Sequence, residues 1–89
     1  MKTIRLIVKG KVQGVYYRAF IKKMADQLSV SGWVKNLPDK NVEIKATAKE
    51  EQLQQFINWC KQGSPGAIVN EVIIEDSDYE LFNGFGITR

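Results

Sequence analysis

Two helical patterns enclose a pair of strand patterns in this chain, and that order constrains the fold more than any other feature. Residues 18–28 carry apolar side chains at the spacing of one helix face, namely Ile21, Met24, Ala25 and Leu28. A second stripe follows position 49 and consists of Leu53, Phe56, Ile57 and Cys60. Gly63 and Pro65 then end this second helix. Each of these amphipathic helices needs an apolar surface to cover.

Strand patterns supply that surface. Residues 3–10 alternate, with Ile4, Leu6 and Val8 on one face. The segments "VSGWVKN" (30–36) and "NVEIKATA" (41–48) form a hairpin around the turn "LPDKN". A fourth strand is "AIVNEVIIE", and after the acidic turn "EDSDYE" the segment "YELFNGFGITR" (79–89) is a fifth. Thr47 and Glu50 have the spacing of a capping box, which predicts a helix start near Lys49.

The order β-α-β-β-α-β-β predicts an α+β protein with a ferredoxin-like fold. In this βαββαβ sandwich two helices cover one face of an antiparallel sheet. The last predicted strand is then a return strand added to that sheet. With 89 residues the chain is expected to form a single domain spanning 1–89.

Composition narrows the chemistry. The chain has no histidine and a single cysteine, Cys60, so imidazole bases, His-ligated zinc, thiolate clusters and internal disulfides are excluded. A net charge of +3 favours anionic ligands weakly and is small for a nucleic-acid binder. No apolar run approaches the ~20 residues that span a bilayer, and the first segment lacks a signal-peptide core. We expect a cytoplasmic protein without metal, cofactor, nucleic-acid partner or membrane partner.

The stretch "KGKVQGVYYRAF" (9–20) connects the first strand to the first helix. It could be a plain strand-to-helix turn. Alternatively, Gly10 and Gly14 permit unusual backbone angles that let successive N–H groups converge on an anion. The helix N-terminus adds partial positive charge there, and Arg18 could close over the anion with its planar fork.

Two motifs read together resemble the acylphosphatase family. The first is "GKVQGVYYR", which matches the family signature at Gly10, Val12, Gln13, Gly14, Val15, Tyr17 and Arg18. The second is "GWVKN", which matches at Gly32, Trp33, Val34, Lys35 and Asn36. The segments "VEIKA", "GSPGAIV" and "FGITR" extend the resemblance over essentially the whole chain.

The resemblance implies a hydrolase that cleaves the carboxyl–phosphate bond of acyl phosphates to a carboxylate and inorganic phosphate. It makes Arg18 the phosphate-binding arginine and Asn36 the residue that positions the attacking water. The phosphate cradle would comprise the backbone amides of Gln13, Gly14, Val15, Tyr16, Tyr17 and Arg18. In-line attack by water would then need neither a metal nor a covalent intermediate. We expect a monomer that also takes phosphate or sulfate as a ligand.

Several positions depart from the family pattern or have a plainer interpretation. Ser29, Lys40 and Ala48 replace glycines that are usual in the family, and Asn41 is expected to take the left-handed position in the hairpin. The Gln13 side chain is expected to hold the loop through a hydrogen bond rather than to act in catalysis. Tyr16 and Tyr17 are expected to be packing residues, and Cys60 to be a buried small hydrophobe.

Two other functions remain open from the sequence. RNA-recognition domains share the element order, and "NGFGIT" superficially resembles their signature, but "VEIKAT" and "TIRLIVKG" lack the stacking aromatics. A regulatory ferredoxin-like domain could instead bind phosphate or another small molecule without turnover.

Overall fold

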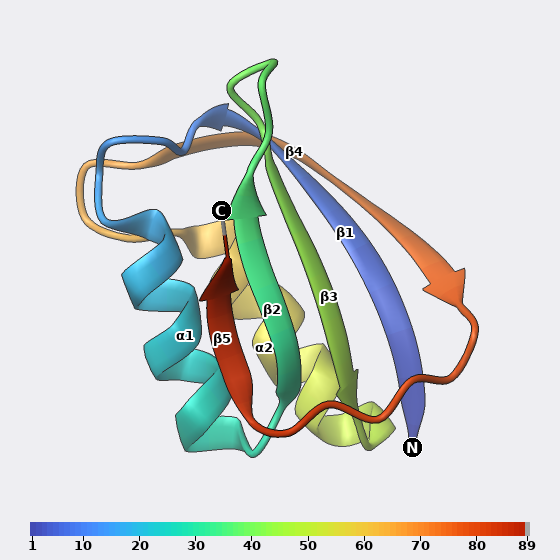
Figure 1. The fold of residues 1–89 in the computed structure, drawn as a ribbon. Helices are drawn as coiled ribbons and strands as arrows, with labels where there is room; N and C mark the ends of the chain where they lie inside the picture. Colours follow the sequence, from blue (N-terminus) through green and yellow to red (C-terminus); the bar gives the residue numbers. More distant parts are fainter. Residues whose placement is uncertain (89) are drawn as a thin grey trace.

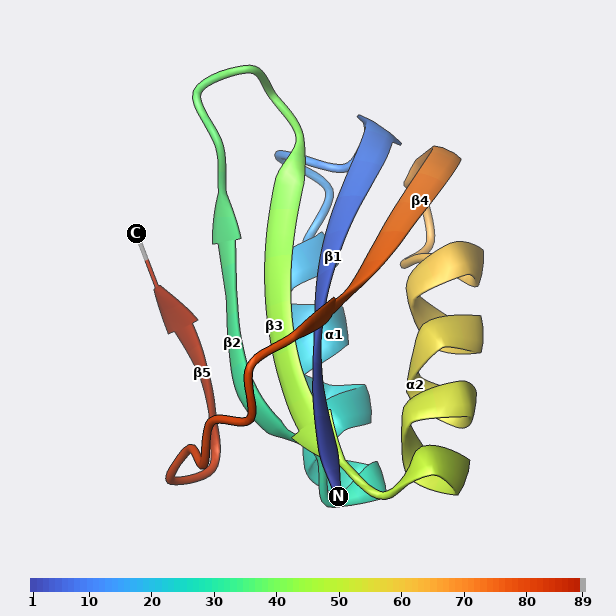
Figure 2. The same cartoon turned by 90° about the vertical axis from the view of Figure 1, so that its right-hand side faces the viewer.

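The computed structural model describes residues 1–88 and has the predicted ferredoxin-like architecture. Its elements are β1 (Lys2–Lys11), α1 (Tyr17–Leu28), β2 (Ser31–Asn36), β3 (Val42–Ala48), α2 (Glu50–Gln62), β4 (Ile68–Ser77) and β5 (Phe85–Thr88). The strands form one sheet in the order β4-β1-β3-β2-β5, and both helices lie on one face of it (Figures 1 and 2). Figure 1 looks onto the opposite, uncovered face, called the outer face below. No helix within residues 1–88 has the length and hydropathy to cross a membrane.

The core lies between the helices and the sheet, as the alternating patterns predict. Ile4, Leu6 and Val8 of β1 are buried toward the helices, beside Ile44 of β3. The helix stripes cover them with Ile21, Ala25, Leu53, Phe56 and Cys60, all of them buried. Each buried aliphatic or aromatic side chain of this size contributes about 1.5–3 kcal/mol. Burial of one face of the sheet therefore fixes which side of every strand meets α1 and α2.

The last part of the chain corrects one prediction. The expected strand over 79–89 is shorter, because β5 begins only at Phe85; its predicted end, position 89, lies outside the described residues. β5 pairs parallel with β2, so the sheet is mixed rather than antiparallel. The direction follows from topology: β4 ends at the end of the sheet where β2 begins (Figure 1). A chain that crosses the sheet there must run alongside β2 in the same direction.

The crossing segment is held against the outer face by two threonines (Figure 2). The N–H of Glu80 donates to Thr3 Oγ1 at 2.9 Å, and Thr47 Oγ1 donates to the Glu80 carbonyl at 2.7 Å. Thr47 therefore does not form the predicted capping box with Glu50. The N-cap of α2 is Lys49, whose N–H donates to the side-chain oxygen of Gln52 at 3.2 Å.

The turn between β2 and β3 corrects a second prediction. Lys40, not Asn41, takes the left-handed conformation, with a φ of 74°. Asn41 is held in the hairpin because its N–H and its side-chain amide each donate to Asp39 at 3.1 Å. Ser29, which follows α1, also replaces a glycine in a left-handed conformation, with a φ of 57°. Both side chains accept backbone strain that glycine would avoid.

Candidate active site

The loop between β1 and α1 leaves a row of main-chain N–H groups without partners. Gly14 and Tyr16 both have left-handed backbones, with φ values of 74° and 59°. The first helical hydrogen bond runs from the Phe20 N–H to the Tyr16 carbonyl at 3.0 Å. Among the described residues, nothing accepts a hydrogen bond from the N–H groups of 13–19. These unpaired N–H groups and the dipole of α1 supply the donors and the partial positive charge that an anion would require.

Glycine is required where this loop leaves the sheet. Gly10 has a φ of 134°, and a side chain there would collide with the carbonyl oxygen of Ile68 on β4. The pairing of β1 with β4 shifts register at this point. The first glycine of the motif thus lies at an irregularity in the pairing just before β1 ends at Lys11, and Gly14 lies in the loop that leads to the helix.

Arg18 lies in the first turn of α1, half-buried, and lines the same cleft as the loop. None of the carboxylates within residues 1–88 forms an ion pair with it. The first turn of α1 also contains no acidic residue. A cation at a helix N-terminus is unfavourable unless an anion compensates it, so the site is electrostatically incomplete without a negatively charged ligand.

Asn36, the last residue of β2, reaches the cleft from the sheet. Its side-chain oxygen Oδ1 is buried, and no group within residues 1–88 donates a hydrogen bond to it. An unpaired buried acceptor costs about 1–3 kcal/mol, which a water molecule or ligand in the cleft would offset. The cleft has a volume of about 420 Å³ and is lined by Val12, Gln13, Gly14, Tyr16, Tyr17, Arg18, Ala19, Asn36 and Ile87.

Side chains from three directions hold the loop in place. Gln13 Nε2 donates to the carbonyls of Leu37 and Asn41 at 2.9 and 2.8 Å, which confirms its expected structural hydrogen bonding. Ser64 Oγ donates to the Val15 carbonyl at 3.0 Å. The hydroxyl of Tyr17 donates to the carbonyl of Cys60 at 2.8 Å beneath the loop.

The two tyrosines of the motif have opposite environments. Tyr17 is buried, as expected of a packing residue, and this burial raises the pKa of its hydroxyl group well above the usual value. Cys60 is buried as expected, and desolvation raises the pKa of its thiol as well. Tyr16 was expected to pack but is 87% exposed, because its left-handed backbone turns the side chain outward from the helix N-terminus.

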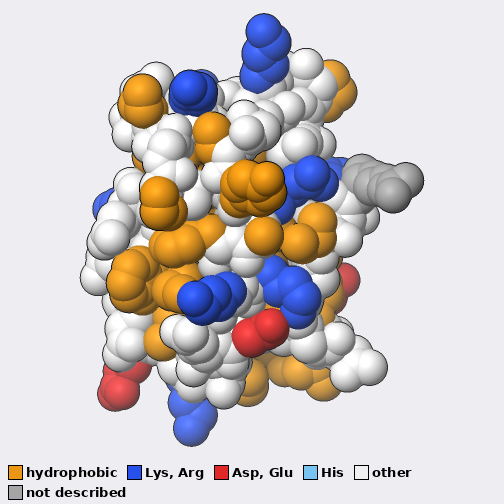
Figure 3. All heavy atoms as spheres, turned by 90° about the vertical axis from the view of Figure 1, so that its left-hand side faces the viewer, with side chains coloured by type: hydrophobic (Ala, Val, Ile, Leu, Met, Phe, Trp, Pro, Cys, Tyr) orange, Lys and Arg blue, Asp and Glu red, His pale blue; other side chains and the backbone are white. Residues whose placement is uncertain are grey.

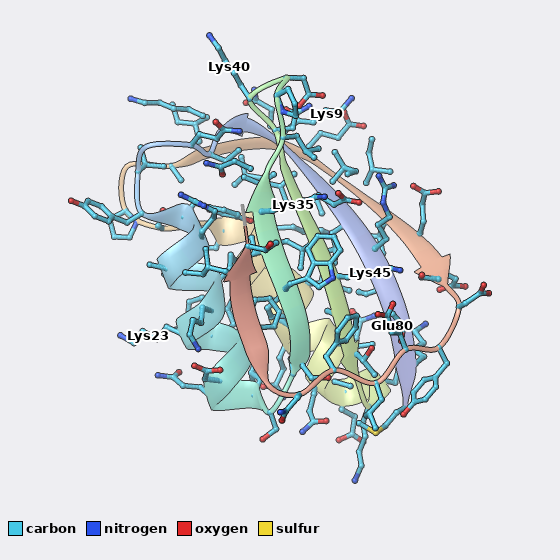
Figure 4. All side chains as sticks on the ribbon, in the orientation of Figure 1. Lys9, Lys23, Lys35, Lys40, Lys45 and Glu80 are labelled. Carbon is cyan, nitrogen blue, oxygen red and sulfur yellow. The ribbon has the colours of Figure 1, made fainter. Side chains whose placement is uncertain are left out.

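The surroundings of the loop are basic. Figure 3 faces the α1 side of the molecule, and the upper part of that face, where the loop lies, shows Lys and Arg side chains but no Asp or Glu. Lys9 and Lys40 lie at the same end of the sheet as the loop (Figure 4). Cations around a concave site raise the local concentration of small anions.

The structure brings together all the sequence-predicted site residues except Val15 around one cleft, and Val15 remains part of the loop itself. Two further residues were missed. Ser64 was visible only as part of "GSPGAIV", and nothing local marks a serine that anchors a distant loop. Ile87 had no signal, because its place beside the cleft depends on the crossing that places β5 next to β2.

Fold and site together define an α+β domain with a cleft at a helix N-terminus, where a glycine-containing loop has unpaired N–H groups. The family model for acylphosphatase matches residues 4–87. An acylphosphatase of Shewanella amazonensis is 41% identical over 90 aligned residues, which cover 100% of this chain and 99% of the relative. One from Marinobacter nauticus is 48% identical over 71 residues, covering 80% of this chain and 77% of the relative.

A solved structure agrees with the sequence relatives. The crystal structure of acylphosphatase from Bacillus subtilis superimposes with a TM-score of 0.97 at 40% identity, over 100% of both chains. The chain therefore belongs to the acylphosphatase family, and its fold and its character as a hydrolytic enzyme are those expected from the two motifs.

Proposed function

We propose that this acylphosphatase-family enzyme cleaves the carboxyl–phosphate bond of acyl phosphates by in-line attack of a water molecule. In this proposal the loop amides and Arg18 bind the phosphoryl group, and Asn36 positions the water. One observation carries it: loop residues, Arg18 and Asn36 line one cleft, and the loop N–H groups, the Arg18 guanidinium and the Asn36 side-chain oxygen have no partner among residues 1–88. Unpaired donors, an unpaired cation and an unpaired acceptor together match a phosphate with an adjacent water.

Phosphate binding uses the donors. In the proposal the amides of 13–18 donate to the phosphate oxygens, and Arg18 offers two parallel N–H groups to a pair of them. Charge-assisted hydrogen bonds of this kind are about twice as strong as neutral ones. They stabilise the phosphoryl oxygens in the transition state, where the bond to the leaving group is already weak.

Water positioning uses the acceptor. The Asn36 carboxamide oxygen can accept one hydrogen bond from water and so direct its lone pair at phosphorus, but a carboxamide cannot take up a proton at neutral pH. We assign the proton of the attacking water to a non-bridging phosphate oxygen of the substrate. The phosphorus–oxygen bond to the acyl group breaks as the new bond forms, and the products are a carboxylate and inorganic phosphate.

The leaving group explains why so few residues suffice. A carboxylate is stable as an anion, so its departure needs no strong general acid. The transition state of phosphoryl transfer is loose, so positioning and electrostatic stabilisation supply most of the rate enhancement. No buried carboxylate or thiolate in the cleft is required as base or nucleophile.

The test measures benzoyl phosphate hydrolysis and inhibition by inorganic phosphate. Arg18→Ala should raise the Ki for phosphate and lose nearly all turnover. Asn36→Ala should keep the Ki and lose turnover, because only the water is misplaced. Lys23→Ala, which removes an exposed cation from the same helix, and Asn58→Ala, on the exposed face of α2, are matched controls. The proposal is wrong if both site variants keep wild-type turnover. It is also wrong if the wild-type protein binds phosphate but does not hydrolyse benzoyl phosphate.

We further propose that the chain acts in the cytoplasm as a monomeric, metal-independent domain over 1–89. Charged groups on β4, one edge strand of the sheet, support the monomer, because Glu71 and Glu75 would face like charges in a self-paired edge. Sedimentation at micromolar concentration and activity in the presence of a chelator test these two points.

A further inference from the structure

The Gln13 side chain joins the two halves of the cleft. It leaves the loop after β1 and reaches the hairpin between β2 and β3, where its Nε2 donates to the carbonyls of Leu37 and Asn41 at 2.9 and 2.8 Å. These two residues are already paired with each other, because the N–H of Leu37 donates to the Asn41 carbonyl at 2.8 Å. Gln13 therefore binds the pair of residues that closes the hairpin, and both N–H groups of its carboxamide are engaged.

The attachment point lies one residue from the water-positioning group. Leu37 directly follows Asn36, so a bond that fixes the Leu37 carbonyl also fixes the end of β2 from which the Asn36 side chain extends. The loop that would hold the phosphoryl group and the strand end that would hold the water come from separate elements. In-line attack requires a defined distance and direction between them, and an error of about 1 Å can cost ~10²-fold in rate.

We infer that Gln13 is a positioning residue for the reaction: it sets the geometry of the Asn36 oxygen relative to the bound phosphoryl group. This inference rests on the proposed function. Glutamine suits the task because its carboxamide presents two donors to two carbonyl acceptors on a side chain long enough to span the gap. Glutamate would place a carboxylate against two carbonyl oxygens, and asparagine is one methylene shorter.

Ser64 provides a matched comparison, because its side chain also holds this loop. Its hydroxyl donates to the Val15 carbonyl at 3.0 Å and ties the loop to the segment after α2. Both side chains thus restrain the loop by hydrogen bonds to main-chain carbonyls. Of these two side chains, Gln13 alone connects the loop to the hairpin that carries Asn36.

The experiment is a double-mutant cycle. Gln13→Met, which keeps the length and removes the donors, and Ser64→Ala are each made in the wild type and in Asn36→Ala. Benzoyl phosphate turnover and the Ki for inorganic phosphate are measured for all six proteins. Gln13→Met should lower kcat by roughly 10- to 100-fold with the Ki for phosphate nearly unchanged. In Asn36→Ala the same substitution should lower kcat by less than about threefold, because the group it positions is already absent.

Ser64→Ala should change kcat by the same factor in both backgrounds. The inference is overturned if Gln13→Met leaves kcat unchanged, if its effect is equally large in Asn36→Ala, or if it raises the Ki as much as it lowers kcat. If circular dichroism shows that Gln13→Met is unfolded, Gln13→Asn replaces it with the same expected results. Wild-type turnover by Asn36→Ala would refute the proposed function itself, which keeps the two failures distinguishable.

Discussion

The outer face of the sheet and the cleft each carry an arginine. Within residues 1–88, the arginine of the outer face has carboxylate partners and the arginine of the cleft has none. Arg5 Nε lies 2.6 Å from Glu43 Oε2, and its Nη1 lies 3.0 Å from Glu75 Oε1. Lys45 pairs with Glu80 at 3.4 Å on the same face (Figure 4). Arg18 in the cleft has no such carboxylate among residues 1–88. Paired charges indicate a structural surface, whereas a half-buried cation kept without a partner indicates a binding site.

The hydrogen bonds of the outer face and of the cleft differ as their charges do. On the outer face, Thr3 and Thr47 satisfy the main chain of Glu80. In the cleft, the Asn36 oxygen and the N–H groups of 13–19 remain unsatisfied within the described chain. Hydrogen bonds are therefore satisfied on the outer face and left open in the cleft. Under the proposed function, substitutions on the outer face should change stability and substitutions in the cleft should change activity.

The largest effect is expected from Arg18→Glu. Charge reversal should lower kcat/KM for benzoyl phosphate by roughly 10³-fold or more, since an arginine that stabilises a transferring phosphoryl group is worth that much. The free energy of unfolding should rise by about 0.3–1 kcal/mol, because an acid replaces a cation at the N-terminus of α1. Urea denaturation and steady-state kinetics measure the two. A variant that is both inactive and less stable would contradict the separation.

Thr47→Val should have the opposite profile. The substitution removes the two hydrogen bonds of the Thr47 hydroxyl, to Thr3 Oγ1 and to the Glu80 carbonyl, and leaves that carbonyl only the longer bond from Thr3 at 3.3 Å. The free energy of unfolding should therefore fall by about 1–3 kcal/mol. The kcat should stay within about twofold of wild type, because the site is distant from the cleft. Equilibrium urea denaturation tests this, with Ser77→Ala on β4 as the control. A large loss of kcat in the folded variant would show that the two regions are coupled.

Arg5→Met should cost less. The variant loses the ion pairs to Glu43 and Glu75. Because this network is partly exposed, the free energy of unfolding should fall by about 0.5–1 kcal/mol. The carboxylates hold the pKa of Arg5 above its ordinary value, chiefly because Arg5 donates a hydrogen bond to Glu43. The loss should shrink as salt is added, because salt screens the wild-type pairs. A salt-independent loss, or one matched by Lys11→Met, would mean that packing rather than charge is responsible.

The smallest effect is expected in the hairpin. Lys40→Gly should raise the free energy of unfolding by about 0.5 kcal/mol, because glycine adopts the left-handed φ without steric strain. Asn41→Gly should lower the free energy of unfolding, since glycine cannot make the side-chain hydrogen bond to Asp39. Position 41 has no left-handed backbone that glycine would relieve. Thermal unfolding of the two variants distinguishes these positions. A greater gain in stability from Asn41→Gly than from Lys40→Gly would contradict the assignment of the left-handed position to Lys40.

Short-range patterns were sufficient where neighbours in sequence are neighbours in space. The apolar stripes that begin at Ile21 and Leu53 predicted the helices, because a 3.6-residue period places those side chains on one face of a helix. The loop motif predicted backbone angles that favour glycine, and Gly10 and Gly14 have φ values of 134° and 74°. Buried Tyr17 and Cys60 followed from the same local logic.

Other features could not be predicted, because they depend on contacts between distant segments. Thr47 has the sequence spacing of a helix cap, yet its hydroxyl binds Glu80, 33 positions away. Tyr16 lies in a motif whose neighbours pack, yet its left-handed backbone exposes it. The choice of Lys40 over Asn41 for the left-handed position depended on the hydrogen bonds that Asp39 makes.

The sequence by itself determined the helices, the first three strands and the glycine-dependent loop. It also singled out Arg18 and Asn36 as the residues on which the proposed chemistry depends. Only the tertiary structure decided that β5 lies parallel to β2, that Ile87 borders the cleft and that Gln13 ties the loop to the strand end carrying Asn36. The physical reason is range: backbone angles and side-chain periodicity act within a few residues. Relative placement of distant groups is set by the burial and hydrogen bonding of the whole sheet.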